Sequence, residues 1–208
     1  MTHILANPRL YQLYQELGGF FGARVKAIAR HLPVPDGARI IDIGCGPGHI
    51  VRHLPASADY RGFDIDAASI EHARAKFGDR GDFTCGLFDE DSATLHGPAD
   101  IVMMNGVMHH VGDAELDTLL GLIARTLKPG GALFTLDGVY RAGQGRLVRW
   151  LLDNDRGEHV RDLAGYRTLL DRHFGTVAMH LEEDLSRCPY SYAIGVARQP
   201  RTALRNAA

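Results

Sequence analysis

The sequence has few cysteines, no long apolar run and no marked excess of charge of either sign. Its three cysteines, Cys45, Cys85 and Cys188, form no CxxC or cysteine–histidine spacing of the kind that indicates a disulfide framework or a zinc site. We therefore expect reduced thiols and a cytoplasmic protein. No stretch approaches the roughly 18 apolar residues that span a bilayer, and the start of the chain lacks the pattern of a secretory signal.

The charge and histidine patterns exclude further classes of partner. A net charge of −2 over 208 residues provides no broad field that would attract nucleic acid or a membrane surface, so we expect neither as a partner. Seven further histidines are scattered and form no HxH or HxxxH pair with one another, so we expect no metal site: His3, His31, His53, His72, His96, His173 and His180. Length and composition suit one soluble domain of ordinary size.

From residue 39 onward, strand-like and helix-like segments alternate. Strands are predicted at 39–43, 59–63, 82–85, 99–104, 132–137, 176–182 and 190–198, and helices at 48–54, 67–77, 113–127, 144–153 and 162–173. Lys128–Gly131 reads as a stop and turn. The pattern predicts an α/β fold with a doubly wound, mostly parallel, Rossmann-like sheet of seven strands. The last two strands lie too close in sequence for a parallel crossover, so we expect an antiparallel C-terminal hairpin.

The segment IIDIGCGPGHI, residues 40–50, places an acid within a buried strand and three glycines directly after it. Gly44, Gly46 and Gly48 remove the side chains that would keep a ligand from the backbone at the carboxyl edge of the sheet. Asp64 ends the second strand, twenty residues after Gly44, where a carboxylate can accept both hydroxyls of a ribose. The spacing is GxGxG, because His49 stands where a dinucleotide fingerprint has its third glycine.

Four stretches together resemble the class I S-adenosylmethionine-dependent methyltransferases. They are IIDIGCGPGHI, YRGFDID, ADIVMMNGVMHHV and LKPGGALFTLD, which in order and spacing cover about residues 38–137. The resemblance implies S-adenosyl-L-methionine as cofactor and a small-molecule methyl acceptor. It implies that Asp42 meets the loop amides and, directly or through water, the cofactor's amino group, and that methionine and ribose lie against the bare backbone of residues 44–48, Cys45 included.

The same resemblance assigns further cofactor contacts. Asp64 matches the acid that holds the ribose hydroxyls, Ile65 the residue that packs on adenine, and Asn105 a residue near the methionine carbonyl or the sulfonium. One position departs from the pattern, because Leu87 stands where many relatives carry an aspartate that bonds the adenine amino group. Leu87 or Phe88 then supplies apolar packing, or Asp89 reaches back to the adenine.

The predicted catalytic residues are His109, His110 and Asp137. The histidines follow the fourth strand, and imidazole titrates near neutrality, which suits a general base. The pair resembles the His-His of some methyltransferases that act on natural-product hydroxyls, in which an acid after the fifth strand assists; Asp137 occupies that place. His110 matches the position more often histidine, whereas His109 is the one expected to face the substrate more directly, so the choice between them stays open.

The resemblance also suggests an organisation of the chain. Residues 1–36, with helices expected at 10–17 and 20–32, would form an N-terminal helical lid carrying Tyr11 and Tyr14, although aromatic residues at helical spacing also serve as core. Residues 37–199 would form the core, with a substrate-binding insert at 140–161, and 200–208 a tail. The insert holds five arginines, which either grip an anionic acceptor or form a solvated face with ion pairs.

Several alternatives stay open at this stage. The acceptor atom is oxygen, nitrogen or carbon, a protein side chain is a possible acceptor, and the oligomeric state is unknown. A nicotinamide oxidoreductase on a similar sheet is a second function, against which His49 argues. A third is a module that binds S-adenosylmethionine without catalysis.

Overall fold

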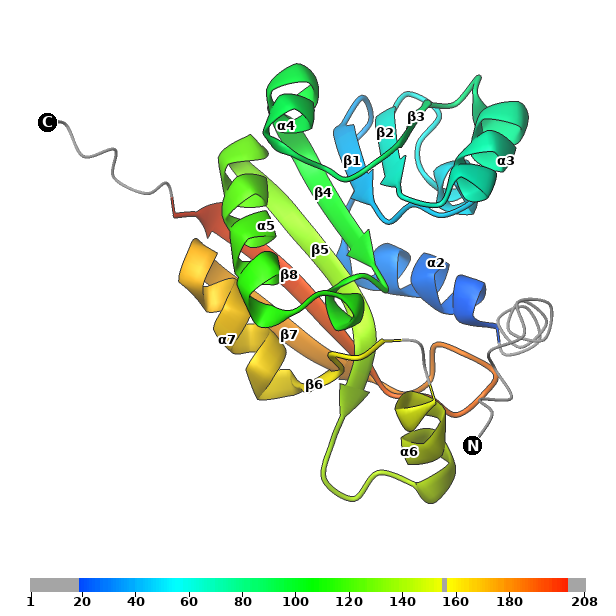
Figure 1. Ribbon diagram of the computed structural model, residues 1–208, viewed down its shortest axis with the longest axis vertical. Helices are drawn as coiled ribbons and strands as arrows, with labels where there is room; N and C mark the ends of the chain where they lie inside the picture. Colours follow the sequence, from blue (N-terminus) through cyan, green and yellow to red (C-terminus); the bar gives the residue numbers. More distant parts are fainter. Residues whose placement is uncertain (1–18, 155–156, 202–208) are drawn as a thin grey trace, which may run out of the picture.

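The computed structural model describes residues 19–154 and 157–201, in which one mixed sheet lies between two layers of helices (Figure 1). The strands are β1 (Arg39–Ile43), β2 (Asp59–Asp64), β3 (Asp82–Cys85), β4 (Ala99–Asn105), β5 (Leu127–Tyr140), β6 (Arg161–Asp162), β7 (Phe174–Glu182) and β8 (Tyr192–Pro200). The helices are α2 (Phe20–His31), α3 (Ala67–Phe77), α4 (Glu90–His96), α5 (Asp113–Thr126), α6 (Arg146–Asp153) and α7 (Leu163–His173), with 3-10 turns η2 (His49–His53) and η3 (Met108–His110).

The sheet order is β3-β2-β1-β4-β5-β8-β7, with the short β6 paired to β5. Strands β1 to β5 run parallel, and β8 runs antiparallel to both β5 and β7. The predicted doubly wound sheet with an antiparallel C-terminal hairpin is therefore confirmed.

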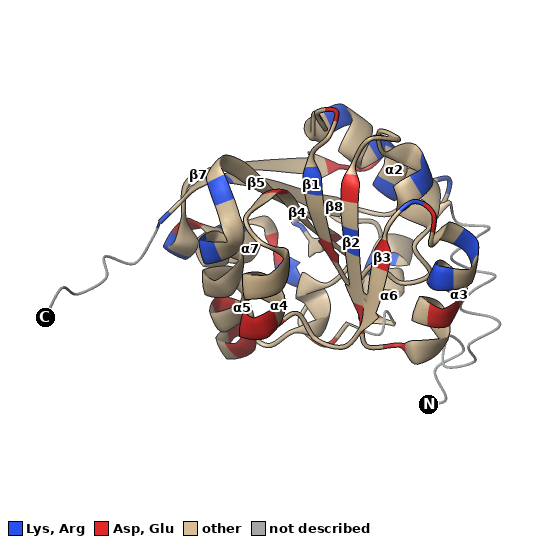
Figure 2. Ribbon diagram, turned by 90° about the horizontal axis from the view of Figure 1, so that it is seen from above, with Lys and Arg blue, Asp and Glu red and all other residues tan. Residues whose placement is uncertain are grey.

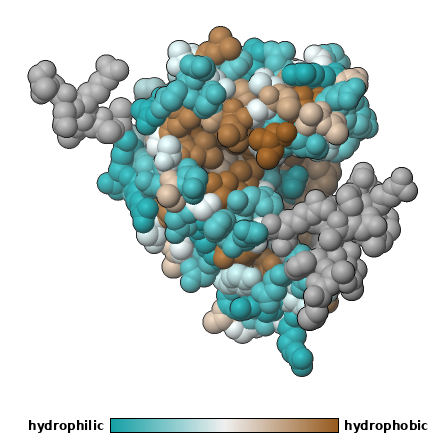
Figure 3. Space-filling view, in the orientation of Figure 1, coloured by the Kyte–Doolittle hydropathy of each residue, from teal (hydrophilic) through white to brown (hydrophobic). Residues whose placement is uncertain are grey.

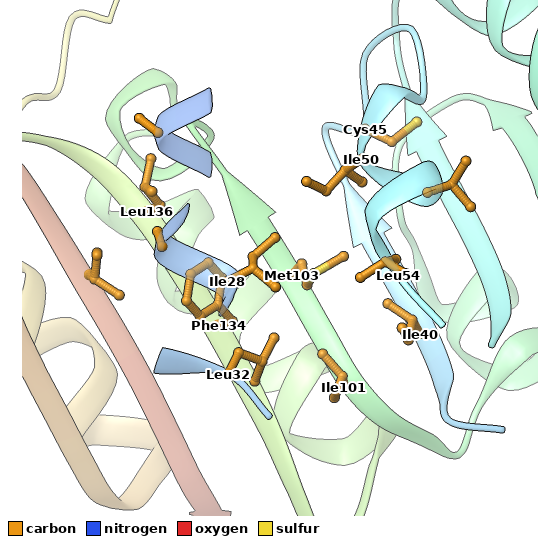
Figure 4. Close-up of a cluster of buried hydrophobic side chains, with 14 of the residues drawn as sticks. Ile28, Leu32, Ile40, Cys45, Ile50, Leu54, Ile101, Met103, Phe134 and Leu136 are labelled. Atoms are coloured by element: carbon orange, nitrogen blue, oxygen red, sulfur yellow. The ribbon is translucent and has the colours of Figure 1, made fainter. Parts of the chain in front are cut away.

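Successive residues of the central strands enter two separate cores because side chains alternate across a strand. Ile40 faces the core beneath α2, α3 and α6, whereas Ile41 faces the core beneath α5 and α7. Figure 4 shows the first of these cores, where Ile28 of α2 and Leu32, which directly follows this helix, lie over Met103 and Phe134 of the sheet. Buried apolar residues on both faces explain why the strands read as near-continuous hydrophobic runs.

Two details of the fold differ from the sequence prediction. Helix α4 was not predicted, because it buries none of its residues and so has no apolar periodicity. Its signals are local: Asp89 accepts a hydrogen bond from the Ser92 amide at 2.8 Å and caps the helix. The prediction that residues 128–131 form a turn before the strand was wrong, since β5 already begins at Leu127 and includes these residues. The register between β4 and β5 shifts at this segment.

The structure describes only part of the segments that were predicted as the N-terminal lid and the C-terminal tail. The helix expected at 10–17, with Tyr11 and Tyr14, lies outside them, as do residues 202–208. Helix α2, within the range assigned to the lid, packs on the sheet through Ala23, Ala27 and Ile28. Within 19–154 and 157–201, no helix is both long and apolar enough to cross a membrane.

The order of the strands reverses between β1 and β4, because the chain first builds outward to β3 and then returns to the other side of β1. Loops that leave the carboxyl ends of β1 and β4 therefore diverge, which opens a crevice where ligands bind in such sheets. Figure 3 shows this face of the molecule hollowed beside the β1–β3 end, with hydrophobic surface next to the hollow.

Leu133→Ala tests how much the core beneath α5 and α7 stabilises the sheet. Leu133 is 0% exposed on β5, so the substitution should lower the free energy of unfolding by about 2–5 kcal/mol. Leu95→Ala is the matched control, because Leu95 is 76% exposed and its loss should change stability by less than about 0.5 kcal/mol. Urea denaturation followed by circular dichroism measures both, and equal effects would contradict the assignment of the core.

Candidate active site

The loop after β1 has the bare backbone that its three glycines predict, but each glycine serves a different purpose. A Cβ on Gly44 would overlap Val107 of the loop after β4, and a Cβ on Gly48 would lie 2.7 Å from the ring of Phe83. Gly46, at φ +54°, has no atom of residues 19–154 or 157–201 within 4 Å of the position of a Cβ. Gly44 and Gly48 are therefore required by packing and by positive φ, whereas Gly46 borders open space in which a ligand fits.

Asp42 is buried, at 1% exposure, on the face of β1 that α2 covers. The hydroxyl of Tyr60, on the neighbouring β2, donates to Asp42 Oδ2 at 2.6 Å. Burial raises the pKa of Asp42 to about 6, against the lowering effects of the Tyr60 hydrogen bond and of the Arg24 cation. The other oxygen, Oδ1, has no hydrogen-bond partner among the described residues.

Asn105, at the end of β4, is the second buried polar residue of the crevice. Both polar atoms of its side chain lack a hydrogen-bond partner of good geometry within the described part of the chain. Leaving buried donors and acceptors unpaired costs free energy. Asp42 Oδ1 and the Asn105 amide therefore form a polar surface suited to a bound molecule.

The resemblance implied that the backbone amides of the glycine loop contact Asp42, but these amides donate to other acceptors. The amides of Gly44 and Cys45 donate to the Phe63 carbonyl at 2.8 and 3.0 Å, and that of Gly46 donates to Asp64 Oδ2 at 2.8 Å. Asp42 instead accepts a hydrogen bond from the Tyr60 hydroxyl. These three loop amides therefore do not donate to Asp42, contrary to the prediction. Cys45 is buried against Gly62, and burial raises the pKa of its thiol well above the usual range, so it is not a nucleophile.

Asp64 and the residues after β2 and β3 line one side of the crevice. Asp64 Oδ1 accepts from the Asp66 amide at 2.9 Å, so both carboxylate oxygens are held by backbone N–H groups. Ile65 and Leu87 are large apolar residues, yet they are 72% and 75% exposed. Two such exposed apolar side chains on either side of Asp64 favour the predicted packing on an adenine ring.

Phe88 does not share this exposure. It is buried in the core beneath α5 and α7, with its ring 5.2 Å from that of Phe63 and nearly perpendicular to it. Asp89 caps α4 and does not reach back toward the crevice in this structure. Of the three residues considered for the adenine, Leu87 is the one whose side chain is available.

His109 and Asp137 form a buried pair at the ends of β4 and β5. His109 Nδ1 lies 2.7 Å from Asp137 Oδ1, which also accepts the His109 backbone N–H at 3.2 Å. Because an ionised carboxylate only accepts hydrogen bonds, Nδ1 carries the ring proton. This fixes the tautomer and leaves Nε2 as the basic atom.

His110 differs from its neighbour in exposure and contacts. It is exposed, and its ring centroid lies 4.1 Å from that of His109. The predicted assistance from Asp137 therefore goes to His109.

The pair and the glycine loop belong to one site. A Cβ built on Gly106, directly after β4, would lie 3.6 Å from His109 Cε1 and 3.5 Å from Arg24 Nη2. Arg24 is close enough to Asp42 to lower the pKa of that carboxyl. Base, cation and buried acid thus surround the end of β4, beside the loop after β1.

The insert lies over η3 (Met108–His110), which we call the histidine turn. Helix α6 packs on the sheet through Leu151 and Leu152. Beyond it, the His159 amide donates to the His109 carbonyl at 2.9 Å, and Gly157 lies so close to the His109 ring that a Cβ there would overlap it. Residues 157 and 159 of the insert therefore lie against His109, and the substrate-binding role of the insert stays a prediction.

The arginines of the insert do not form one anion-binding cluster. Arg141 bonds Glu183 at 2.8 Å, and Arg149 pairs with Asp153 and lies over the Tyr140 ring. Arg161 bonds Asp113 and three backbone carbonyls. These contacts favour the ion-paired alternative for the three residues.

The comparisons with known proteins agree with this geometry. Residues 41–133 match the model of a methyltransferase domain. The chain is 32% identical over 166 residues to the ubiquinone biosynthesis O-methyltransferase of Chelativorans sp. (strain BNC1), a match that covers 74% of this chain and 62% of that protein. It is 29% identical over 110 residues to the cyclopropane-fatty-acyl-phospholipid synthase of Escherichia coli (strain K12), covering 52% of this chain and 28% of that enzyme.

The fold matches that of human N-acetylserotonin methyltransferase, crystallised in complex with SAM, with a TM-score of 0.67 and 20% identity. That match covers 93% of this chain and 55% of the other. In sequence and fold the chain is similar to S-adenosylmethionine-dependent methyltransferases. It spans less than two thirds of the length of each of the three relatives. This similarity argues against the nicotinamide oxidoreductase alternative.

Two residues of this methyltransferase site were missed by sequence reasoning. Tyr60 lies eighteen positions after Asp42 and meets it only because β2 pairs with β1. Arg24 reaches the end of β4 from α2. Arg24 belongs to none of the four motif stretches, and Tyr60 begins one of them without an assigned role, so only the pairing of distant elements reveals both roles. Among the described residues, no group of three or more His, Cys, Asp or Glu could hold a metal ion.

Asp42→Asn should stabilise the methyltransferase at neutral pH. The folded pKa of Asp42 is about 6, whereas an unfolded aspartate has a pKa of about 3.9. As the pH rises from about 4 to about 6, the unfolded chain releases this proton while the folded one keeps it, so the free energy of unfolding falls. Above about pH 6 the cost is complete and on the order of 3 kcal/mol, which asparagine avoids.

Urea denaturation at pH 4.5 and pH 7.5 checks this expectation. The free energy of unfolding of Asp42→Asn should exceed the wild-type value more at pH 7.5 than at pH 4.5. Asp79→Asn, at an exposed position, is the control and should give the same small difference at both pH values. An Asp42→Asn advantage that does not grow with pH would mean that the buried carboxylate carries no such cost.

Proposed function

We propose that this chain transfers a methyl group from S-adenosyl-L-methionine to an oxygen or nitrogen atom of a small molecule. The observation that carries the proposal is the His109–Asp137 pair, held at 2.7 Å beside the glycine loop of β1. A base fixed by a buried carboxylate, next to a bare-backbone ligand loop, suits removal of a proton from an acceptor during group transfer.

The residues of the crevice fit the cofactor. Open space at Gly46 accommodates the methionine and ribose against the backbone, and Asp64 accepts the ribose hydroxyls. Ile65 and Leu87 flank the adenine with their exposed apolar side chains. Asn105, a buried amide next to Asp42, takes the methionine end.

The charged ends of the methionine moiety match two opposite charges of the site. Asp42 presents its unpaired Oδ1 to the α-ammonium group, and a bound cation there favours the ionised carboxylate. Arg24, the cation next to Gly106, receives the α-carboxylate. Because Asp42 and Arg24 are separate groups beside the end of β4, the zwitterionic methionine moiety has one acidic and one basic partner.

When bound, S-adenosylmethionine supplies an electrophilic methyl group on a positively charged sulfur, which leaves as a neutral thioether. His109 Nε2 takes the proton of the acceptor O–H or N–H while the new bond to the methyl carbon forms. Asp137 Oδ1 holds the Nδ1 proton and stabilises the imidazolium that results. The insert excludes water from His109 by covering its ring with Gly157.

His109 is the base in this proposal, and His110 is not. His109 is a buried imidazole held by the Asp137 carboxylate, which fixes its tautomer and direction, whereas His110 is exposed to solvent. Stacking of the two rings at 4.1 Å lets His110 form part of the acceptor surface.

The surface argues for a small acceptor. Figure 2 shows both basic and acidic residues on the ribbon of the described chain, and the net charge is −2, whereas a nucleic-acid-binding protein is expected to carry a basic surface. We therefore propose a small-molecule acceptor rather than nucleic acid or a membrane surface. The free thiols of Cys45, Cys85 and Cys188 suit a reducing, cytoplasmic location.

Gly46→Val should abolish binding of S-adenosylhomocysteine, because the new side chain fills the space next to the loop. Gly37→Val is a matched control: Gly37 also has positive φ and nothing within 4 Å of a Cβ, but lies before β1 at the opposite edge of the sheet. Both variants carry similar backbone strain of about 1–3 kcal/mol, so calorimetric titration separates strain from loss of the site. Normal affinity in Gly46→Val would exclude this loop as the cofactor site.

His109→Gln should lower kcat for a hydroxyl acceptor by about 10²–10⁴-fold, the usual contribution of a general base. S-adenosylhomocysteine affinity should stay at the wild-type value, since His109 is assigned to the acceptor. His110→Gln is the control and should change kcat far less. Transfer of a radiolabelled methyl group to a panel of small phenols and amines provides the assay; absence of transfer to every member, with normal cofactor binding, would favour the non-catalytic module.

A further inference from the structure

Arg161 has more hydrogen bonds than its place in an arginine-rich insert suggests. Its side chain is only 11% exposed. Nε and Nη2 donate to Asp113 Oδ1 at 2.9 and 2.6 Å. Nη1 donates to the Met108 and His159 carbonyls, and Nη2 to the Val111 carbonyl, each at 2.8 Å.

These acceptors belong to the histidine turn and its surroundings. Met108 begins η3 and Val111 follows it, so the guanidinium holds carbonyls on both sides of His109 and His110. Asp113 opens α5, the next helix. The third carbonyl, of His159, comes from the insert, whose His159 amide also donates to the His109 carbonyl.

The backbone of Arg161 is anchored to the other half of the catalytic pair. Arg161 lies in β6 and pairs with Val139 of β5, two residues beyond Asp137. Tyr166 strengthens this anchor, since its hydroxyl donates to the Gly138 carbonyl at 2.9 Å and accepts from the Arg161 amide at 3.4 Å. One residue thus joins the strand that carries Asp137 to the turn that carries His109.

We propose that Arg161 is a positioning residue that sets the His109–Asp137 geometry and fastens the insert over it. The proposal rests on the proposed function, in which His109 is the base. The backbone of Arg161 fixes the end of β5, and the Arg161 guanidinium fixes the turn after β4. The cover over the acceptor and the base beneath it are therefore assembled as one unit.

The chemistry of the guanidinium explains why arginine occupies this position. Its planar fork presents five N–H donors in fixed directions, and here all three nitrogens are used on four acceptors. A lysine ammonium on a flexible stem has only three donors at one point and cannot span carbonyls on both sides of the turn.

The test measures the geometry of His109 without an acceptor. In wild-type protein, nitrogen-15 NMR of the histidine rings should give the shifts of an Nδ1–H tautomer for His109, with an Nδ1 proton protected by Asp137. Arg161→Met, which keeps much of the side-chain volume, should move these shifts toward the tautomer average and abolish the protected proton signal. Titration with S-adenosylhomocysteine should give wild-type affinity, because the cofactor loop lies on β1.

Matched variants separate positioning from general stability. Arg161 and Arg172 both line a surface cavity of about 530 Å³, but Arg172 donates to Asp117. Arg172→Met is therefore the control, and the His109 shifts should stay at wild-type values. Gly157→Ala, which keeps Arg161 but introduces a Cβ against the His109 ring, should disturb the same signals. If Arg161→Met does not fold, Arg161→Lys is measured in its place and should reproduce the loss of the Nδ1 proton.

Wild-type His109 shifts in a folded Arg161→Met or Arg161→Lys protein would overturn the proposal. So would an equal disturbance in Arg172→Met, since it would assign the effect to loss of any nearby charge. Because neither measurement uses methyl transfer, failure here is distinguishable from failure of the proposed function, which is decided by Gly46→Val binding and His109→Gln turnover.

Discussion

The reversal of strand order between β1 and β4 is the constraint on which the site depends. A parallel sheet that grows first to one side of β1 and then to the other must send the loops after β1 and β4 apart. The two loops still touch at their bases, where Val107 occupies the place of a Gly44 side chain. The crevice is therefore narrow at its floor and open above Gly46.

The floor of this crevice contains polar groups that the fold alone does not satisfy. Asp42 and Asn105 are buried at the ends of β1 and β4 with unpaired atoms, and Tyr60 satisfies only one oxygen of the acid. Such groups lower stability in the empty protein. Under the proposed function a ligand with complementary charges pairs with them, so stability and binding are opposed at Asp42.

The acceptor side is built by different means. There the polar groups are paired with one another: Asp137 holds His109, and Arg161 holds the turn that carries it. The cofactor side thus presents unpaired atoms on rigid strand ends, whereas the acceptor side is completed by the insert folding back onto β5 through β6. This arrangement allows the insert to vary in a family whose sheet is common to many acceptors.

Local chemistry explains what the sequence alone predicts. The two-residue alternation, the positive φ of glycine and the spacing of Asp64 after the loop are properties of single segments, so the parallel strands, the cofactor loop and the C-terminal hairpin follow from them. Helix α4 was missed because it buries nothing and has only capping signals.

Packing between distant segments decided the rest. Leu87 and Phe88 are adjacent and both apolar, and only the core around Phe63 determines that Phe88 is buried and Leu87 exposed. His109 and His110 are adjacent and of the same residue type, but His109 is buried against Asp137, twenty-eight residues away, whereas His110 is exposed. The roles of Arg24, Tyr60 and Arg161 likewise depend on which strands and helices become neighbours, and that is set by the free energy of burying the whole core rather than by any residue's immediate sequence.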